Sequence, residues 1–229
     1  ASLAGINLGG DASQIDKAIA TAKTRYFVNQ FIEKHELLPI LLAVESFNKE
    51  TGTYLFDSEI YDEANNQFTT QYIQDNPAYM EQAYEEFVTK VLGVSKDNMT
   101  GFVSISIKLT SSVLAKKLLD SFINELSELL KQREIENTSK HITYLNQELE
   151  KIKSTEVKVL LYQIQQQSLE KLSYIKTQSN YLFDVIEPPY LSEKPVEPKK
   201  VFMVILGWIV GLVFGVLLSF IVYSPRKNV

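Results

Sequence analysis

The 229-residue chain contains no cysteine and only two histidines. Without cysteine it can form no disulfide framework and supply no thiolate nucleophile. His35 and His141 both lie among charged residues of predicted helices, and neither belongs to an HxxxH or HExxH pattern. Solvated surface positions are therefore expected for both. The sequence predicts no metal site and no cofactor.

A nucleotide site and a nucleic-acid interface are also excluded. Gly5 and Gly10 have the GxxxxG spacing of a phosphate loop, but Asp11 and Ala12 stand where that loop requires Lys and Ser or Thr. An aspartate at this place would repel phosphate. The formal net charge of −5 argues against nucleic acid, whose backbone demands a basic protein face.

Catalytic constellations are missing as well. Paired carboxylates can hydrolyse glycosides, but the acidic groups at 57–63 and 81–86 are loosely spaced, and solvated faces are their default role. The 12 Tyr and 12 Phe could stack on sugars, although core packing is the commoner explanation. We therefore expect a protein that is not an enzyme.

What the chain does have is an uncharged apolar run from Val201 to Tyr223. A helix needs about 20 apolar residues to cross the hydrocarbon core of a bilayer. Basic residues flank the run on both sides, and Trp208 and Tyr223 suit an aromatic belt. The run predicts a transmembrane helix at 201–223 in contact with the lipid bilayer, followed by a cytoplasmic tail at 224–229. A buried core helix is the alternative.

Within this run, Gly207, Gly211 and Gly215 repeat every four residues on one helix face. Small residues at this spacing let two helices approach closely in lipid, although glycine is in any case common in transmembrane helices. We expect these glycines to form a packing face. The run holds no ionisable residue, so an ion or proton path is not expected.

Residues 1–110 are expected to form the first part of an α/β base domain. Asp11 and Gln14 resemble a capping box for a helix ending near His35, with one face made of Ile15, Ile19, Ala22, Tyr26 and Gln30, and with Phe27 and Phe31 beside it. The segment 40–44 fits either a strand or a helix. Asn76 and Pro77 are typical of a helix start, and Gly93 is expected to end that helix. At 102–109, apolar residues alternate with Ser and Lys, which predicts a half-buried strand.

Residues 111–178 contain no proline and no glycine and predict a long helical hairpin with coiled-coil character. Ser111 or Ser112 can cap the first helix, and Leu118, Phe122, Leu126 and Leu129 line its first half. Farther along, a seam with heptad spacing follows, made of Ile135, Ile142, Leu145, Leu149 and Ile152. A polar break at 154–155 precedes a second helical pattern, which suggests an antiparallel return. One continuous helix to residue 178 is the competing interpretation.

Residues 179–187 predict a short strand that returns to the base domain. The segment 188–200 then contains four prolines, Pro188, Pro189, Pro195 and Pro198. Proline at this density disfavours helix and favours an extended, stiff linker. Such a linker forbids one unbroken helix from the hairpin into the apolar run.

This order of parts resembles the Wzz-type chain-length determinants, the polysaccharide co-polymerases of bacterial inner membranes. The most specific portion runs from YLFDVIEPP (181–189) through the proline-rich linker and PKK (198–200) to the glycine-spaced apolar run. LFDSEIYD (55–62) and STEVKVLLYQIQQQSLEKL (154–172) also look like family segments. The resemblance covers nearly the whole chain. Because the chain starts at Ala1 without a signal peptide, we expect the family's N-terminal transmembrane segment to lie upstream.

The resemblance implies an α+β fold: a membrane-proximal α/β domain with a long extended helical hairpin, followed by a C-terminal transmembrane helix. Most of such a chain is periplasmic and anchored in the inner membrane. It forms homo-oligomeric rings and sets the modal length of a surface polysaccharide, here the O-antigen of lipopolysaccharide. It acts on a separate polysaccharide polymerase and the growing glycan without catalysing bond formation. The chain ends six residues after Tyr223, which resembles the kinase-free type.

Three other functions stay open on the sequence alone. A tail-anchored coiled-coil membrane adaptor or fusion protein fits the heptads and the apolar run, but it fits the proline-rich linker poorly. A sensor domain cut from a receptor lacks an output module, because the tail is short. A glycan-active enzyme would be revealed by turnover of the isolated domain.

Overall fold

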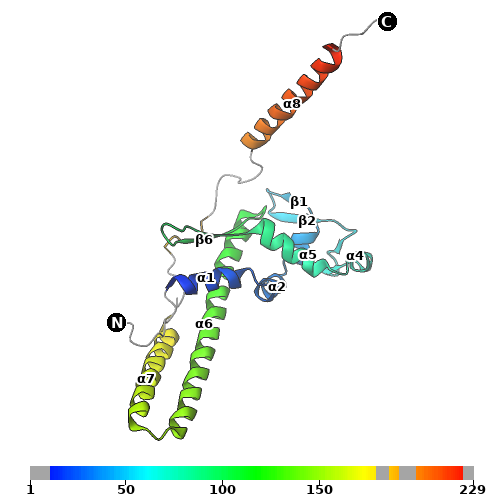
Figure 1. Ribbon diagram of the computed structural model, residues 1–229. Helices are drawn as coiled ribbons and strands as arrows, with labels where there is room; N and C mark the ends of the chain where they lie inside the picture. The colour runs from blue at the N-terminus through cyan, green and yellow to red at the C-terminus, as the bar shows by residue number, and fades with distance from the viewer. Residues whose placement is uncertain (1–10, 179–185, 191–199, 224–229) are drawn as a thin grey trace. The chain divides into compact units, whose positions relative to one another are not determined.

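The computed structural model describes residues 11–178, 186–190 and 200–223 (Figure 1). The chain divides into two units, Ala1–Tyr190 and Leu191–Val229, which are described separately. The first unit contains helices and short strands in the order α1 Asp11–Ala22, α2 Arg25–Lys34, α3 Leu38–Leu42, β1 Val44–Asn48, β2 Thr53–Phe56, β3 Tyr61–Asp62, β4 Gln67–Phe68, α4 Thr70–Asp75, α5 Tyr79–Glu86, η1 Phe87–Val91, β5 Leu92–Lys96, β6 Val103–Ile107, α6 Ser112–Lys151 and α7 Thr155–Thr177.

The helix predicted from Asp11 to about His35 is two helices. The chain breaks after Ala22, and Thr24 caps the second helix by accepting a hydrogen bond from the Phe27 backbone N–H at 3.4 Å. The break resets the helical phase. Phe27 and Phe31 are therefore buried, whereas Tyr26, which belonged to the predicted apolar face, is exposed.

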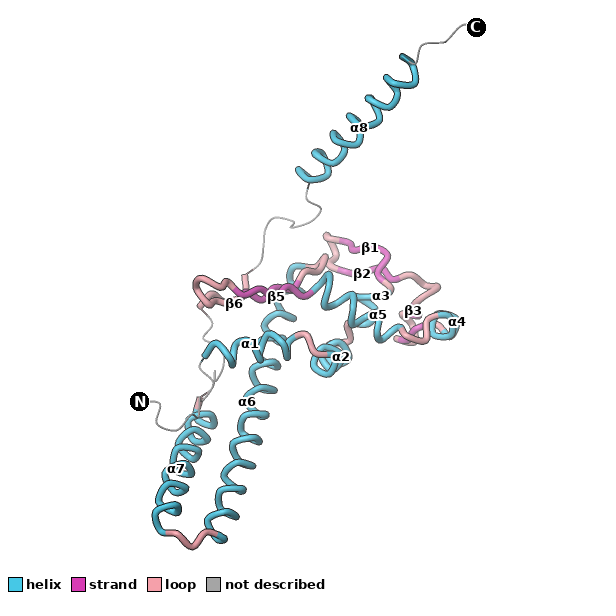
Figure 2. The backbone as a smooth tube through the Cα atoms, in the orientation of Figure 1, coloured by secondary structure: helices cyan, strands magenta, loops and turns pink. Residues whose placement is uncertain are grey.

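Among the residues that the structure describes, the strands pair locally, in three two-stranded antiparallel hairpins (Figure 2). The strand predicted at 102–109 is confirmed as β6, and its exposure alternates as the sequence pattern requires. Its partner strand β5 was not predicted from the sequence, because Gly93 was expected to end the helix that starts near Asn76. Gly93 instead lies within β5 and pairs with Ser106 of β6.

The helix predicted to start at Asn76 and Pro77 is also corrected. Asn76 ends α4, and the next helix, α5, begins at Tyr79. It passes into a short π-helix, η1, which buries Phe87 and Val91 before the chain enters β5. A π-helical turn shifts the side-chain phase, so this stretch does not follow the α-helical period that the prediction assumed.

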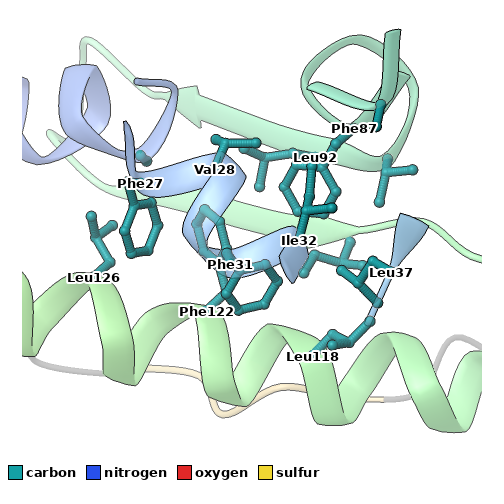
Figure 3. Close-up of a cluster of buried hydrophobic side chains, with 14 of the residues drawn as sticks. Phe27, Val28, Phe31, Ile32, Leu37, Phe87, Leu92, Leu118, Phe122 and Leu126 are labelled. Carbon is teal, nitrogen blue, oxygen red and sulfur yellow. The ribbon is translucent and has the colours of Figure 1, made fainter. Parts of the chain in front are cut away.

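A cluster of phenylalanines forms the centre of the core (Figure 3). Phe122 of α6 lies with its ring centroid 5.1 Å from those of both Phe27 and Phe31 of α2, in edge-to-face arrangements. The ring of Phe87 also packs against Phe122, with the two ring centroids 6.2 Å apart. Leu118 and Leu126, one turn before and after Phe122, are buried in the same cluster. The predicted apolar face of the first half of α6 is therefore the core contact of the base.

The second unit contains one described element, α8 Lys200–Tyr223. Among the residues that the structure describes, no helix combines the length and the apolar character that crossing a membrane requires. This finding contradicts the predicted transmembrane helix at 201–223. The fold is corrected to a mixed helix-and-strand unit with a helical hairpin, and a separate helix.

The remaining predictions for the C-terminal third fall partly outside the described residues. Residues 179–185 of the returning strand predicted at 179–187 lie outside them, as do Pro195, Pro198 and the tail at 224–229. The described residues 186–187 of that segment are not in a strand. Pro188 and Pro189 are described and belong to no helix or strand. Gly207, Gly211 and Gly215 face open space, with no described atom within 4 Å of where a Cβ would lie.

Candidate interaction surface

The helical hairpin of α6 and α7 begins at a side-chain cap that is tied to the base. Ser111 caps α6 by accepting a hydrogen bond from the Leu114 N–H at 3.3 Å. The Ser111 N–H in turn donates to the hydroxyl of Tyr54 in β2 at 3.2 Å. The start of the long helix is therefore fixed to a strand of the base through one tyrosine.

A short turn reverses the chain at the far end of α6. Residues 152–154 leave the helical conformation, and Ser154 caps α7 by accepting a bond from the Val157 N–H at 3.4 Å. The Ser154 hydroxyl also donates to the Glu156 carboxylate at 2.7 Å, which lowers the pKa of Glu156. The sequence prediction of two helices rather than one is confirmed. The observed break at 152–154 overlaps the predicted break at 154–155 only at Ser154, because Thr155 already begins α7.

Polar bonds across the hairpin set its antiparallel register. The side-chain amide of Gln165 donates to Asn146 at 2.6 Å near the turn, and the Lys171 ammonium lies 2.5 Å from Glu134 farther from it. Lys131 then donates to the backbone carbonyl of Gln178 at 2.7 Å. As the numbering rises along α7 it falls along α6, so the two helices run antiparallel, as Figure 1 shows.

The predicted seam lies between the two helices, with one addition. Leu145 and Leu149 are buried, and Ile135 and Ile142 are partly buried. Ile152 is also partly buried but lies in the turn after α6, not in the helix as the seam predicted. Thr138 is buried among them. It continues the heptad, but because it is polar it was not predicted to belong to the seam. From α7, Ile175 is fully buried and Ile164 and Leu172 are partly buried.

A second seam with heptad spacing lies on the outer face of α7. It consists of positions spaced four, three, four, three and four residues apart, and all of them are uncharged: Thr155, Val159, Tyr162, Gln166, Leu169 and Ser173. At about 100° per residue these positions lie roughly 130° around the helix from the residues that face α6. All six are exposed, including the three large apolar side chains, which are each about half exposed or more. We call this set the outer seam.

The outer seam was not predicted from the sequence, because one apolar row on α7 is enough to explain its packing on α6. That row consists of Leu161, Ile164, Leu172 and Ile175, and the outer seam is a second row on the same helix. The signal was present in the sequence, since alternating spacings of four and three are the coiled-coil period.

The histidines have no shared site. The predicted solvated position is wrong for His35, which is partly buried with its ring nitrogen 2.7 Å from the Glu125 carboxylate. His141 is exposed on α6, as predicted. Within the described ranges, no group of three or more His, Asp or Glu side chains is arranged to hold a metal ion. The outer seam is an exposed apolar row of the first unit that could contact another macromolecule.

Comparison of the chain with known protein families, with curated proteins and with solved structures finds no match.

Proposed function

We propose that this protein regulates the chain length of a bacterial surface polysaccharide, the O-antigen of lipopolysaccharide. In this proposal it works as a homo-oligomeric co-polymerase on the periplasmic side of the inner membrane, beside a separate polymerase, and forms no glycosidic bond itself. The proposal combines the family resemblance of the sequence with the folded base and hairpin of the first unit. It makes no use of α8.

The observation that carries the proposal is the outer seam. An exposed, uncharged row of Val159, Tyr162 and Leu169 at coiled-coil spacing leaves apolar surface in water that a neighbouring helix would cover. Because every copy carries the same row on a helix held in the same hairpin, a second copy supplies a partner of matching period. Side-by-side association of hairpins then builds the oligomer that a length-setting scaffold needs.

The function is tested by deleting the gene and separating the surface polysaccharide on a gel. We expect loss of the modal length distribution, with total polymer still made because the polymerase is a separate protein. An unchanged distribution would refute the proposed function. Complementation with the full chain should restore the modal band.

The assembly is tested with the double substitution Val159→Lys and Leu169→Lys. Two buried lysine charges at each contact would oppose association, so light scattering of the full chain should show a shift toward the monomer. Leu160→Lys is the matched control, because Leu160 is equally exposed on α7 but lies off the outer seam. A monomeric wild-type chain, or an equal effect of the control, would remove the seam from the proposal.

A further inference from the structure

The base contains an open hollow of about 350 Å³ beside the strands β2 and β3. Its wall combines side chains of two kinds, apolar groups from α3 and β2 and polar groups from the α2–α3 connection and the β3–β4 hairpin. The lining residues are Glu36, Pro39, Ile40, Phe56, Tyr61, Glu63 and Asn66. The volume lies at the small end of the range found for small-molecule sites.

The floor of the hollow is aromatic and fixed in place. Tyr61 is only 7% exposed, and its ring packs edge-to-face on Phe56 with centroids 5.3 Å apart. The Tyr61 hydroxyl donates a short hydrogen bond to the side-chain oxygen of Asn66. Burial and then the charges of Glu36 and Glu63 raise the pKa of Tyr61, which places both carboxylates within electrostatic reach of the ring.

Neither carboxylate has a cationic partner among the described residues. The nearest ammonium in sequence, that of Lys34, lies 2.9 Å from Glu125 instead. Two exposed carboxylates therefore border one hollow whose apolar wall is formed by Pro39, Ile40 and Phe56. Apolar walls of low dielectric concentrate the field of such charges and attract ions of the opposite sign.

The hydrogen-bond donors and acceptors of the lining side chains also favour a cationic ligand. Ionised carboxylates only accept hydrogen bonds, and the Tyr61 hydroxyl already donates to Asn66. The amide N–H₂ of Asn66 is thus the side-chain donor that the lining offers. A ligand that fits must bring donors of its own, and an ammonium or guanidinium group carries donors and no acceptor. Aromatic faces add cation–π attraction.

The conformation of Glu36 is unfavourable for its residue type. The bonds from Glu36 N–H to the Glu33 carbonyl and from Leu37 N–H to the Ile32 carbonyl end α2 in a Schellman motif. Glu36 occupies the left-handed position of that motif, with φ of 52°, where glycine is usual. Glycine would be more favourable than glutamate at this backbone position. Glu36 nevertheless places a carboxylate at the rim of the hollow.

We propose that this hollow binds an organic cation, an alkylammonium or guanidinium group whose charge lies between Glu36 and Glu63 and whose apolar stem lies on Phe56 and Ile40. Such a group is available both on a free amine and on a lysine or arginine side chain of another protein. The proposal goes beyond the proposed function and does not depend on it.

The test is a titration of the full chain with n-butylammonium chloride, followed by the NMR signals of Ile40, Phe56 and Tyr61. Saturable shifts at these residues are expected, and the matched neutral ligand 1-butanol should bind about tenfold more weakly because it lacks the charge. Equal binding of the amine and the alcohol, or shifts spread over the surface without saturation, would overturn the proposal.

Substitutions locate the site. The double variant Glu36→Gln and Glu63→Gln should weaken butylammonium binding about tenfold. The matched double variant Glu45→Gln and Glu50→Gln changes two exposed carboxylates outside the hollow and should leave binding unchanged. An equal loss in both variants would show a general charge effect and refute the site.

Glu36→Gly separates binding from folding. Glycine fits the left-handed position better than glutamate, so the unfolding midpoint should rise while butylammonium binding falls. Retained binding in this variant would contradict the proposal, because no loss of fold could have masked it.

The source of the cation follows from a second ligand pair, Nα-acetyl-lysine-N-methylamide and its norleucine analogue. If the lysine compound binds at least as well as butylammonium, the hollow accepts a side chain from a protein partner. If it binds much more weakly than butylammonium, the hollow takes a free amine. Equal binding of the lysine and norleucine compounds would refute recognition of the charge.

Discussion

His35 at the end of α2 and Glu125 of α6 lie 2.7 Å apart, although 90 residues separate them in the chain. Lys34 reaches the same carboxylate oxygen at 2.9 Å. Both His35 and Glu125 are mostly shielded, with side-chain exposures of 19% and 24%. One carboxylate thus fixes the end of α2 against the long helix, at the border of the phenylalanine cluster.

Replacing Glu125 with alanine should therefore destabilise the base. We expect a loss of about 1–2 kcal/mol in the free energy of unfolding, because two polar partners lose a partly shielded acceptor. Chemical denaturation followed by circular dichroism measures it. Glu136→Ala is the control, since its pair with Lys140 is solvent-exposed and such pairs add little. An equal change in the two variants would contradict the assigned role of Glu125.

Phe122→Ala should be among the most damaging substitutions in the chain. The ring is fully buried and contacts Phe27 and Phe31, so truncation leaves a cavity and costs about 3–5 kcal/mol. Phe102→Ala, at a site that is 58% exposed, should leave the unfolding midpoint almost unchanged. Similar midpoints for the two variants would mean that the cluster is not the centre of the core.

The pairing of β5 with β6 predicts a coupling between Gly93 and Ser106. A Cβ added at Gly93 would collide with the Ser106 Oγ unless that hydroxyl turns to another rotamer, so Gly93→Ala should be less favourable in the wild-type chain than without the hydroxyl. In a Ser106→Ala background the obstructing oxygen is gone, and alanine should then be neutral or better, because glycine within a strand is itself unfavourable. A double-mutant cycle on unfolding free energies measures the coupling, and additive effects would refute the predicted contact.

Three tyrosines of the base predict a loss of stability at alkaline pH. Burial raises the pKa values of Tyr54, Tyr61 and Tyr72 above the ordinary 10.0, and the hydrogen bond from the Ser111 N–H only partly offsets this effect at Tyr54. The folded state therefore holds these protons more tightly than the unfolded chain does. The stabilisation is complete below the unfolded pKa and disappears as the pH rises through the folded values.

On the alkaline side of pH 10 the unfolding midpoint should fall over the same pH range in which the tyrosinate absorbance rises. Tyr61→Phe should reduce the dependence of the midpoint on pH there, because one of the contributing groups is gone. A wild-type midpoint that stays constant across the tyrosine titration would contradict the burial of these hydroxyls.

The hairpin shows what the sequence could predict. Ser111 was one of the two predicted caps of the first helix, because Ser side-chain oxygens accept backbone bonds at helix starts, and it caps α6. The polar break was predicted at 154–155, and Ser154 caps α7. Leu145 and Leu149 followed from the heptad, which is a local pattern. These features depend on residues a few positions apart, so the sequence expresses them directly.

The fold of the base was harder to predict from the sequence, because it depends on contacts between segments that are distant in the chain. The break before α2 depends on a threonine cap in the middle of a continuous helical pattern, and the phase of Phe27 follows from that break. The pairing of Gly93 with Ser106 has no signal within β5 itself. The hollow could not be predicted at all, since Glu36, Phe56 and Tyr61 come together only through the fold.

The uninterrupted course of α6 has a mechanical consequence. Its 40 residues extend for about 60 Å, and the same rigid element carries Phe122 near one end and Leu149 near the other. A sideways push on the distal turn at 152–154 would act as on a lever whose pivot is the phenylalanine cluster. A force applied at that turn would therefore act on the phenylalanine cluster through one continuous helix, without any contact near the base.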